Sequence, residues 1–321
     1  VPLAVAALVL AALLLPSHVN ESTDPVDNLG GVLSVVFVAG IVLAINFAPV
    51  PGAKAVAGVI GGVGLLFGAL FMWRQRRAEN PLYDLAVASR RLFWVAGLAG
   101  VIVFGSLMGA MFIGQQYLQD VLGYQPFEAG AAILPAIVAM VIVAPRSATL
   151  VGSIGSRATL LIGYACCLAG FLTMLLLWGE STNYAFVALA YVFVGAGVGF
   201  AGTPASNSLT GSVPVSRAGM ASATADLQRD LGGAVMQSVL GALLTAGYAR
   251  EFAKLIGDLP ASEQSQISDQ VTSELQKSFS SAEVTAQANP QYADAIVSGA
   301  RQSFVDGQRW AYLGGILAVL A

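Results

Sequence analysis

Charged residues are scarce in this chain. Only 10% of its 321 residues are Asp, Glu, Lys or Arg, whereas 56% are hydrophobic. A soluble domain usually carries about 25% charged residues, so a water-soluble fold would have nowhere to place this much apolar surface. The basic residues are few and clustered, which argues against nucleic acid as a partner. The composition therefore predicts a protein that is embedded in a lipid bilayer.

Groups that bind metals or cofactors are equally scarce. The two cysteines, Cys166 and Cys167, are adjacent within an apolar run, and neighbours on a helix point in different directions, so we expect two small buried side chains and no disulfide. The single histidine, His18, cannot build a zinc site with thiols so far away in the sequence. The sequence contains no P-loop and no dinucleotide fingerprint. We expect no cofactor, no metal and no enzymatic activity, with an ion gradient as the energy source.

Long apolar runs, by contrast, are abundant. A transmembrane helix needs about 20 mainly apolar residues, and these runs lack the two-residue alternation of membrane-spanning strands. We therefore expect an all-α membrane protein with about nine transmembrane segments. The shortness of the first and last runs favours a chain that is clipped at both ends. The nine runs are Val1–Pro16, Gly30–Phe47, Ala55–Trp73, Leu92–Ile113, Ala129–Leu150, Ala158–Trp178, Tyr184–Thr203, Ala218–Tyr248 and Arg309–Ala321.

The positions of the basic residues predict the orientation, because short loops rich in Arg and Lys face the cytoplasm. Residues 74–91 form the most basic loop, and the opposite short loops contain only Lys54. The long polar stretch at residues 249–307 then lies outside. Within it, Ser280-x-x-Glu283 and Asn289-Pro290 are typical of helix starts. We expect a small helical cap there; the alternative is a solvated insertion with no role in transport.

Three motifs resemble one family of membrane proteins. The run QQYLQDVLGYQPFEAG at residues 115–130, followed by AAILP, resembles the external loop of fourteen-helix drug:proton antiporters of the major facilitator superfamily. The stretches RAGMAS at 217–222 and RDLGGA at 229–234 are similar to the penultimate helix of that family. The glycine-rich stretch GAGVGF at 195–200 resembles the helix before it. The resemblance covers nearly the whole chain and implies a major facilitator-type helical bundle.

The resemblance also implies a division of the chain. Residues 1–16 would be the last helix of the N-terminal half, and residues 29–73 would be two extra linker helices. Residues 92–321 would form an incomplete C-terminal six-helix bundle, while the first five helices of the family are absent. The implied activity is proton-coupled export of small lipophilic drugs across the cell membrane, with no obligate protein partner.

A degenerate copy of the family's cytoplasmic gating loop lies at residues 148–157. Gly155 and Arg157 match the family pattern, whereas Gly152 and Ser153 replace its aspartate and the following arginine. Gly155 and Arg157 are therefore candidates for a gating loop that lacks most of its charge relay.

One cluster of charges lies inside an apolar run. Asp226, Arg229 and Asp230 share one face of the expected helix, where Asp226 can pair with Arg229. Charges within a membrane cost about 2.5–3.5 kcal/mol each and usually serve a function, so this cluster is a candidate for proton coupling. The resemblance supports Arg229 alone. Alternatively, the cluster lies at the cytoplasmic interface and neutralises itself, since Leu231–Tyr248 supplies about 27 Å of apolar helix without it.

Polar and aromatic residues near the outer end of a neighbouring helix are candidates for the substrate path. Gln115, Gln116 and Gln119 could line an exit route. Tyr117 and Phe112 could offer aromatic surface to a flat lipophilic substrate, although Tyr117 is also typical of an interface anchor. Two other functions stay open: export of an endogenous lipid or metabolite, and a membrane scaffold or sensor that acts through the external loop.

Overall fold

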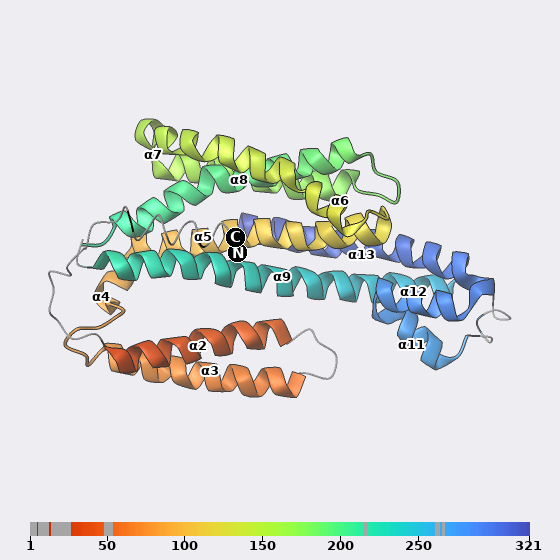
Figure 1. Ribbon diagram of the computed structural model, residues 1–321, viewed down its shortest axis with the longest axis horizontal. Coiled ribbons are helices and arrows are strands. Elements are labelled where there is room, and N and C mark those ends of the chain that lie inside the picture. Colours follow the sequence, from red (N-terminus) through yellow and green to blue (C-terminus); the bar gives the residue numbers. More distant parts are fainter. Residues whose placement is uncertain are drawn as a thin grey trace.

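The structure is a computed structural model that describes residues 27–47, 54–214, 217–260 and 267–321, together with Val5, Leu13 and Gln264. The described part is a set of long helices that run roughly side by side (Figure 1). The expected run Val1–Pro16 lies outside the described residues, apart from two positions. The long helices are α2 (Asn28–Phe47), α3 (Lys54–Gln75), α5 (Arg91–Gln116), α7 (Leu134–Leu177), α8 (Tyr184–Gly211), α9 (Ala218–Gly257) and α13 (Ala293–Leu320).

Six helices in the described ranges are long and apolar enough to cross a membrane. The expected number of nine segments is not recovered by this measure. The runs Ala129–Leu150 and Ala158–Trp178 fall almost entirely within one candidate span, Pro126–Leu177, and α13 is not among the six. The all-helical prediction itself agrees with the described elements.

The element α7 consists of two arms that reverse direction at Gly155. The backbone at this glycine has φ 85° and ψ 161°, a region that is essentially accessible only to glycine. The two arms pack against opposite sides of α8, because Gly199 of α8 meets Val143 of the first arm while Gly197 meets Cys167 of the second. The arms therefore correspond to the two runs that the sequence predicts, and Figure 1 shows them beside α8.

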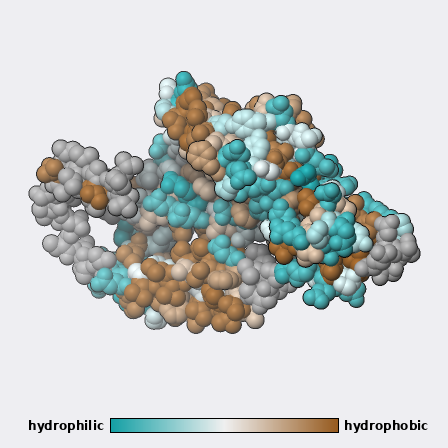
Figure 2. Space-filling model, turned by 45° about the vertical axis from the view of Figure 1, so that its right-hand side comes forward, coloured by the Kyte–Doolittle hydropathy of each residue, from teal (hydrophilic) through white to brown (hydrophobic). Residues whose placement is uncertain are grey.

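The core lies between α5, α7, α8, α9 and α13. The hairpin of α2 and α3 lies apart from this bundle, along the other side of α9 (Figure 1). Figure 2 shows hydrophobic side chains gathered on this hairpin, at the bottom of the view, and many hydrophilic side chains across the middle and the right-hand side. Both surfaces fit a chain in which apolar helices face lipid and a polar segment faces water.

The polar segment at residues 249–307 is largely helical. The helix α9 continues past the expected end at Tyr248 to Gly257, and α13 begins at Ala293 rather than at the start of its apolar run. Between them lie α11 (Asp269–Lys277), α12 (Phe279–Ala288) and the 3₁₀ turn η3 (Pro290–Tyr292). The cap packs on the bundle, since the Tyr248 hydroxyl donates a hydrogen bond of 3.0 Å to the Leu275 carbonyl.

One helix start that was predicted from the sequence of this cap is wrong. The N-cap of α12 is Ser278, whose hydroxyl oxygen accepts from the Ser281 amide at 3.1 Å. The expected capping box of Ser280 and Glu283 is therefore wrong, because the chain enters the helix two residues earlier. Pro290 does occupy a first-turn position, in the 3₁₀ turn that leads into α13.

Candidate functional site

The charge cluster predicted from the sequence lies on the surface of α9. The Arg229 Nη1 atom lies 3.7 Å from the Asp226 Oδ1 atom, which confirms the expected pairing one turn apart. The side chains of Arg229 and Asp226 are 49% and 70% exposed, and Asp230 is exposed beside them. Both side chains of the pair are therefore accessible on this face of α9.

Contacts with the neighbouring helix α5 show how far along that helix the cluster lies. The Arg229 guanidinium lies 5.0 Å from the ring centroid of Phe104, which is halfway along α5 and roughly 20 Å from its start at 1.5 Å per residue. Gly232 of α9 packs directly on the Val101 backbone of α5. The whole of α5 forms part of an apolar membrane-span candidate. These contacts place Arg229 beside the middle of α5, and the position of the cluster relative to the bilayer stays a prediction.

A buried amide lies one helical turn away on the same face of α5. Gln228 is 3% exposed, and its side chain rests against Gly100, which precedes Phe104 by one turn. Neither polar atom of this amide has a hydrogen-bond partner among the described residues. A buried amide without partners costs free energy, so Gln228 has unused hydrogen-bonding capacity beside the charge cluster. Sequence analysis missed both Gln228 and Phe104; the only signal was that Gln228 directly precedes Arg229.

The glutamines of the expected exit path lie at the outer end of α5 and in the π-helical turn η1 (Tyr117–Val121). The Gln115 amide donates to the Ala129 carbonyl at 2.8 Å, and the Gln119 amide donates to the Gln115 carbonyl at 3.3 Å. Gln115, Gln116 and Gln119 are all partly buried. Gln115 therefore joins the end of α5 to α6 (Pro126–Ala131).

The two aromatic candidates for the exit path occupy different surroundings. Phe112 is 38% exposed and lies beside Gly241 of α9, so its ring offers accessible apolar surface. Tyr117 is fully buried, stacks on Trp178 with 4.7 Å between ring centroids, and donates a hydrogen bond of 2.6 Å to the Gly179 carbonyl. The expectation of accessible aromatic surface at Tyr117 is therefore wrong, because its ring and hydroxyl are both used inside the core.

The gating-loop candidates Gly155 and Arg157 lie at the turn of α7. Gly155 supplies the backbone conformation that reverses the chain, and Arg157 is exposed just beyond it. The nearby Arg146 donates to the Ile142 carbonyl of its own arm at 2.6 Å. The turn thus depends on the backbone of Gly155, and its role in gating stays a prediction.

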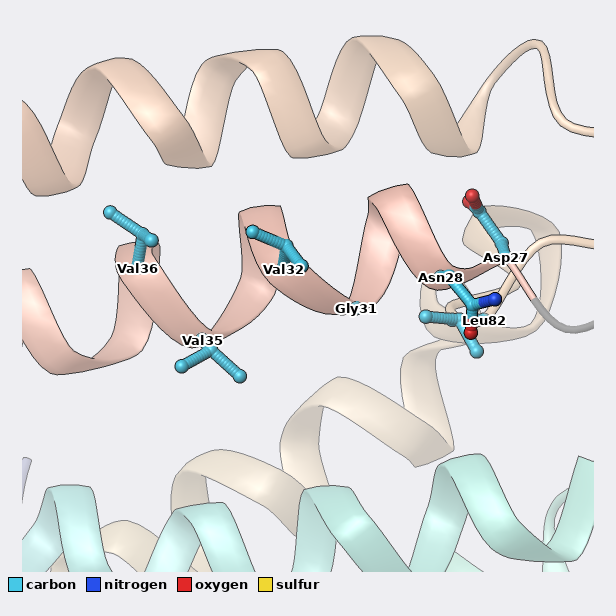
Figure 3. A pocket seen from close by; sticks show the side chains of 7 residues that line it. All are labelled: Asp27, Asn28, Gly31, Val32, Val35, Val36 and Leu82. Atoms are coloured by element: carbon cyan, nitrogen blue, oxygen red, sulfur yellow. The ribbon is translucent and has the colours of Figure 1, made fainter.

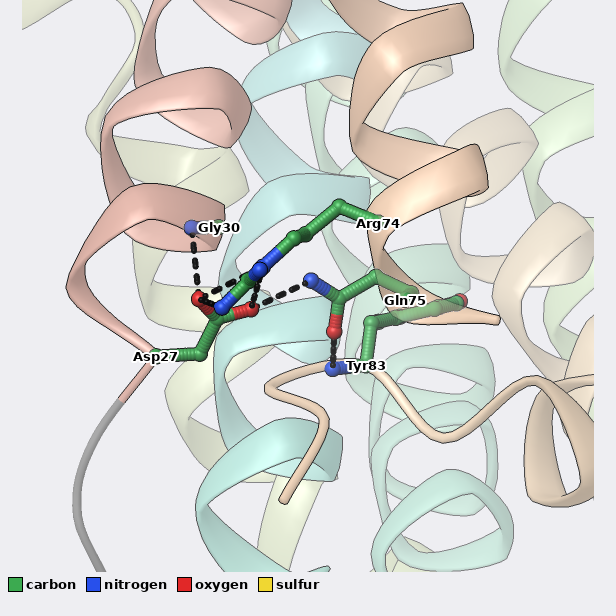
Figure 4. A network of polar contacts seen from close by, with 5 residues as sticks. All are labelled: Asp27, Gly30, Arg74, Gln75 and Tyr83. Atoms are coloured by element: carbon green, nitrogen blue, oxygen red, sulfur yellow. Dashed lines mark hydrogen bonds and ion pairs between the residues drawn. The ribbon is translucent and has the colours of Figure 1, made fainter. Parts of the chain in front are cut away.

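A polar network ties the start of α2 to the end of α3 (Figure 4). The buried Asp27 carboxylate accepts hydrogen bonds from the Gly30 amide at 3.0 Å, from Arg74 at 3.1 Å and from Gln75 at 3.1 Å. The Gly30 hydrogen bond, followed by those from Arg74 and Gln75, lowers the pKa of Asp27 against the opposing effect of burial. The Gln75 carbonyl oxygen also accepts from the Tyr83 amide at 3.0 Å.

A groove of about 550 Å³ begins beside Asp27 and follows α2. Figure 3 shows three valines along α2, with Asn28 and Leu82 near Asp27 at the polar end. The groove does not include the charge cluster on α9. Its lining residues are Asp27, Asn28, Gly31, Val32, Val35, Val36 and Leu82.

The loop after α3 connects this network to α9. Arg217 lies 3.6 Å from the Asp84 carboxylate and donates a hydrogen bond of 2.8 Å to the Pro81 carbonyl. Arg90 donates to the Ser212 carbonyl at 3.0 Å. The basic loop at residues 74–91 therefore lies against the start of α9 and the end of α8, at one end of the molecule.

Metal-binding geometry is not found in the described ranges, where no three His, Cys, Asp or Glu side chains gather closely enough to hold an ion. Cys167 is fully buried and Cys166 is half-buried, and neither forms a disulfide among these residues. The chemistry that the site offers is consequently that of carboxylates, a guanidinium, an amide and an aromatic ring.

Comparison with known proteins gives consistent matches. The family described as Major Facilitator Superfamily matches residues 26–236. The multidrug resistance protein Stp of Mycobacterium tuberculosis is 32% identical over 76% of this chain and 45% of its own length. The multidrug efflux pump LfrA of Mycolicibacterium smegmatis is 31% identical over 77% of this chain and 49% of its own length. The tetracenomycin C resistance and export protein of Streptomyces glaucescens is 26% identical over 77% and 46% respectively. The chain thus spans about half the length of these relatives.

Proposed function

Because this chain belongs to the Major Facilitator Superfamily, we propose that the complete protein exports small lipophilic molecules across the cell membrane in exchange for protons. Membership of this family, together with the six apolar helices of the described ranges, makes the chain part of a multi-pass membrane transporter rather than an enzyme. Relatives named for multidrug resistance or multidrug efflux support drug-like compounds as the cargo. Within the proposal, α2 and α3 are the two extra linker helices, and residues 92–321 belong to the C-terminal bundle.

The observation that carries proton coupling is the position of the Asp226–Arg229 pair. Two exposed carboxylates and one guanidinium lie beside the midpoint of α5, where an unneeded charge would cost about 2.5–3.5 kcal/mol. Protonation of Asp226 would remove its attraction to Arg229 and free the guanidinium to move. In this proposal Asp226 and Asp230 carry the proton, and Arg229 couples their charge to the cavity surface.

The proposed path of the cargo continues toward the outer end of α5. Phe112 has exposed aromatic surface there, and the partly buried Gln115, Gln116 and Gln119 follow it. We include these four residues in the exit path and leave out Tyr117. Gly155 and Arg157 are proposed to form the turn that moves when the cavity opens to the cytoplasm.

The test is accumulation of a fluorescent lipophilic dye in efflux-deficient cells that express the full reading frame, with and without a protonophore. We expect the wild-type protein to lower accumulation and the protonophore to restore it. The Asp226→Asn variant should lose protonophore-sensitive export, whereas Asp258→Asn, at the exposed end of the same helix, should keep it. Protonophore-sensitive export by Asp226→Asn equal to that of the wild type would contradict the role of Asp226.

The same assay separates the alternative functions. Unchanged accumulation of several dyes, with the protein present in the membrane, would favour an endogenous lipid or metabolite as the cargo. A scaffold or sensor would instead require the external segment at residues 249–307 and would show no transport of any cargo.

A further inference from the structure

Phe104 occupies a central position that its sequence context did not reveal. Its ring lies between α8 and α9, since a side chain added at Gly202 would meet the Phe104 ring at 3.2 Å and Arg229 covers the ring from α9. The ring is only partly buried. Three helices of the bundle therefore meet at one aromatic side chain, halfway along α5.

The surroundings of the Arg229 guanidinium have the chemistry of a site for an organic cation. One side faces the Phe104 ring at 5.0 Å and another faces the Asp226 carboxylate at 3.7 Å. An aromatic face attracts cations through its quadrupole, and a carboxylate adds charge complementarity. A positively charged aromatic compound would find the same two partners in the same place.

The amide of Gln228 is an unpartnered polar group close to this position. It is buried one turn from Phe104 along α5, and it has no hydrogen-bond partner among the described residues. Arg229 itself remains half-exposed, so it can leave the ring without unpacking a core. The site thus combines a half-exposed guanidinium with a buried amide that has no hydrogen-bond partner in the described part of the chain.

We propose that Phe104 determines whether the transporter prefers cationic or neutral cargo. We propose also that the Arg229 guanidinium itself occupies the cation-binding position between the Phe104 ring and Asp226. A cationic aromatic cargo displaces the guanidinium from the ring and from Asp226, while a neutral cargo has no such competitor. This inference rests on the proposed function, because it assumes that the surface beside α5 and α9 faces the cargo. It assigns Phe104 and Arg229 opposite effects on cation binding.

The experiment measures binding of tetraphenylphosphonium, a permanent aromatic cation, and of neutral triphenylphosphine oxide to the purified full-length protein. Replacing Phe104 by leucine should raise the Kd for the cation roughly 5- to 30-fold, with a much smaller change for the neutral compound. Phe104→Tyr should restore cation binding, because tyrosine keeps the aromatic face. Arg229→Gln should lower the Kd for the cation, since it removes the competitor.

Phe186→Leu on the exposed surface of α8 is the matched control, and the melting temperature of each variant separates lost binding from lost fold. Equal changes for both compounds in Phe104→Leu would overturn the inference, as would weaker cation binding by Arg229→Gln. Absence of cation binding by the wild-type protein would also overturn it. Failure of the proposed function would differ, because the wild-type protein would then show no protonophore-sensitive export of any compound.

Discussion

Replacing Gly232 by alanine should separate α9 from α5. The added Cβ would overlap the Val101 carbonyl oxygen and lie 3.0 Å from the Val101 Cα. These are backbone atoms, which cannot rotate away as a flexible side chain could. Overpacking of this kind costs about 1–3 kcal/mol, whereas alanine returns at most about 1 kcal/mol through its helix propensity. We therefore expect a net loss of stability together with a shift of Arg229 relative to Phe104.

The assay is thermal unfolding of the purified protein in detergent, combined with export of a lipophilic dye by cells that express it. Gly219→Ala is the matched control, because it lies in the same helix and its added Cβ has no neighbour within 4 Å. Gly232→Ala should melt below both the wild type and Gly219→Ala, and it should export less dye. Equal melting temperatures for the two alanine variants would refute the close α5–α9 contact and, with it, the depth assigned to Arg229.

Two further variants test the turn of α7 and the network at the start of α2. Gly155→Ala should lower the free energy of unfolding by about 1–3 kcal/mol through backbone strain alone, because its added Cβ meets no atom within 4 Å. Gly152→Ala is the control, because its added Cβ also meets no atom within 4 Å. Equal melting temperatures for the two variants would contradict this prediction. Asp27 has a lowered pKa, so its stabilisation is complete above the ordinary aspartate value of about 3.9 and is lost as the pH falls through its own lower value. Asp27→Asn should lower the melting temperature at neutral pH and remove that acid-dependent loss, so parallel pH curves for variant and wild type would count against the network.

Hydropathy predicted the membrane helices well where an apolar run ended at the same place as its helix. The runs at Gly30–Phe47 and Ala55–Trp73 differ from α2 and α3 by at most two residues at each end. The run at Arg309–Ala321 failed in this respect, because the polar residues before it continue the same helix back to Ala293. Apolar length indicates how much of a helix fits in lipid, but it does not indicate where the helix begins.

Only the contacts within a single helix of the candidate site could be predicted from the sequence. Pairing of Asp226 with Arg229 follows from helical periodicity and is confirmed. The depth of this pair depends on Gly232 resting on Val101 of another helix, which no single-helix argument contains. Tyr117 was misplaced for the same kind of reason, since its partners Trp178 and Gly179 come from a distant part of the chain.

The two polar regions of this structure are linked by a single helix. Arg217, just before α9, holds the loop that follows α2 and α3, and Arg229, about three turns later, lies on Phe104. The ion pair of Arg217 with Asp84 is partly exposed, and such pairs contribute little stability, so its effect is to position α9 rather than to strengthen the fold. Close packing at Gly232 leaves α9 no room to approach α5 further. Any tilt of α9 must therefore change the contact of Arg229 with Phe104 and the attachment of the α2–α3 hairpin together.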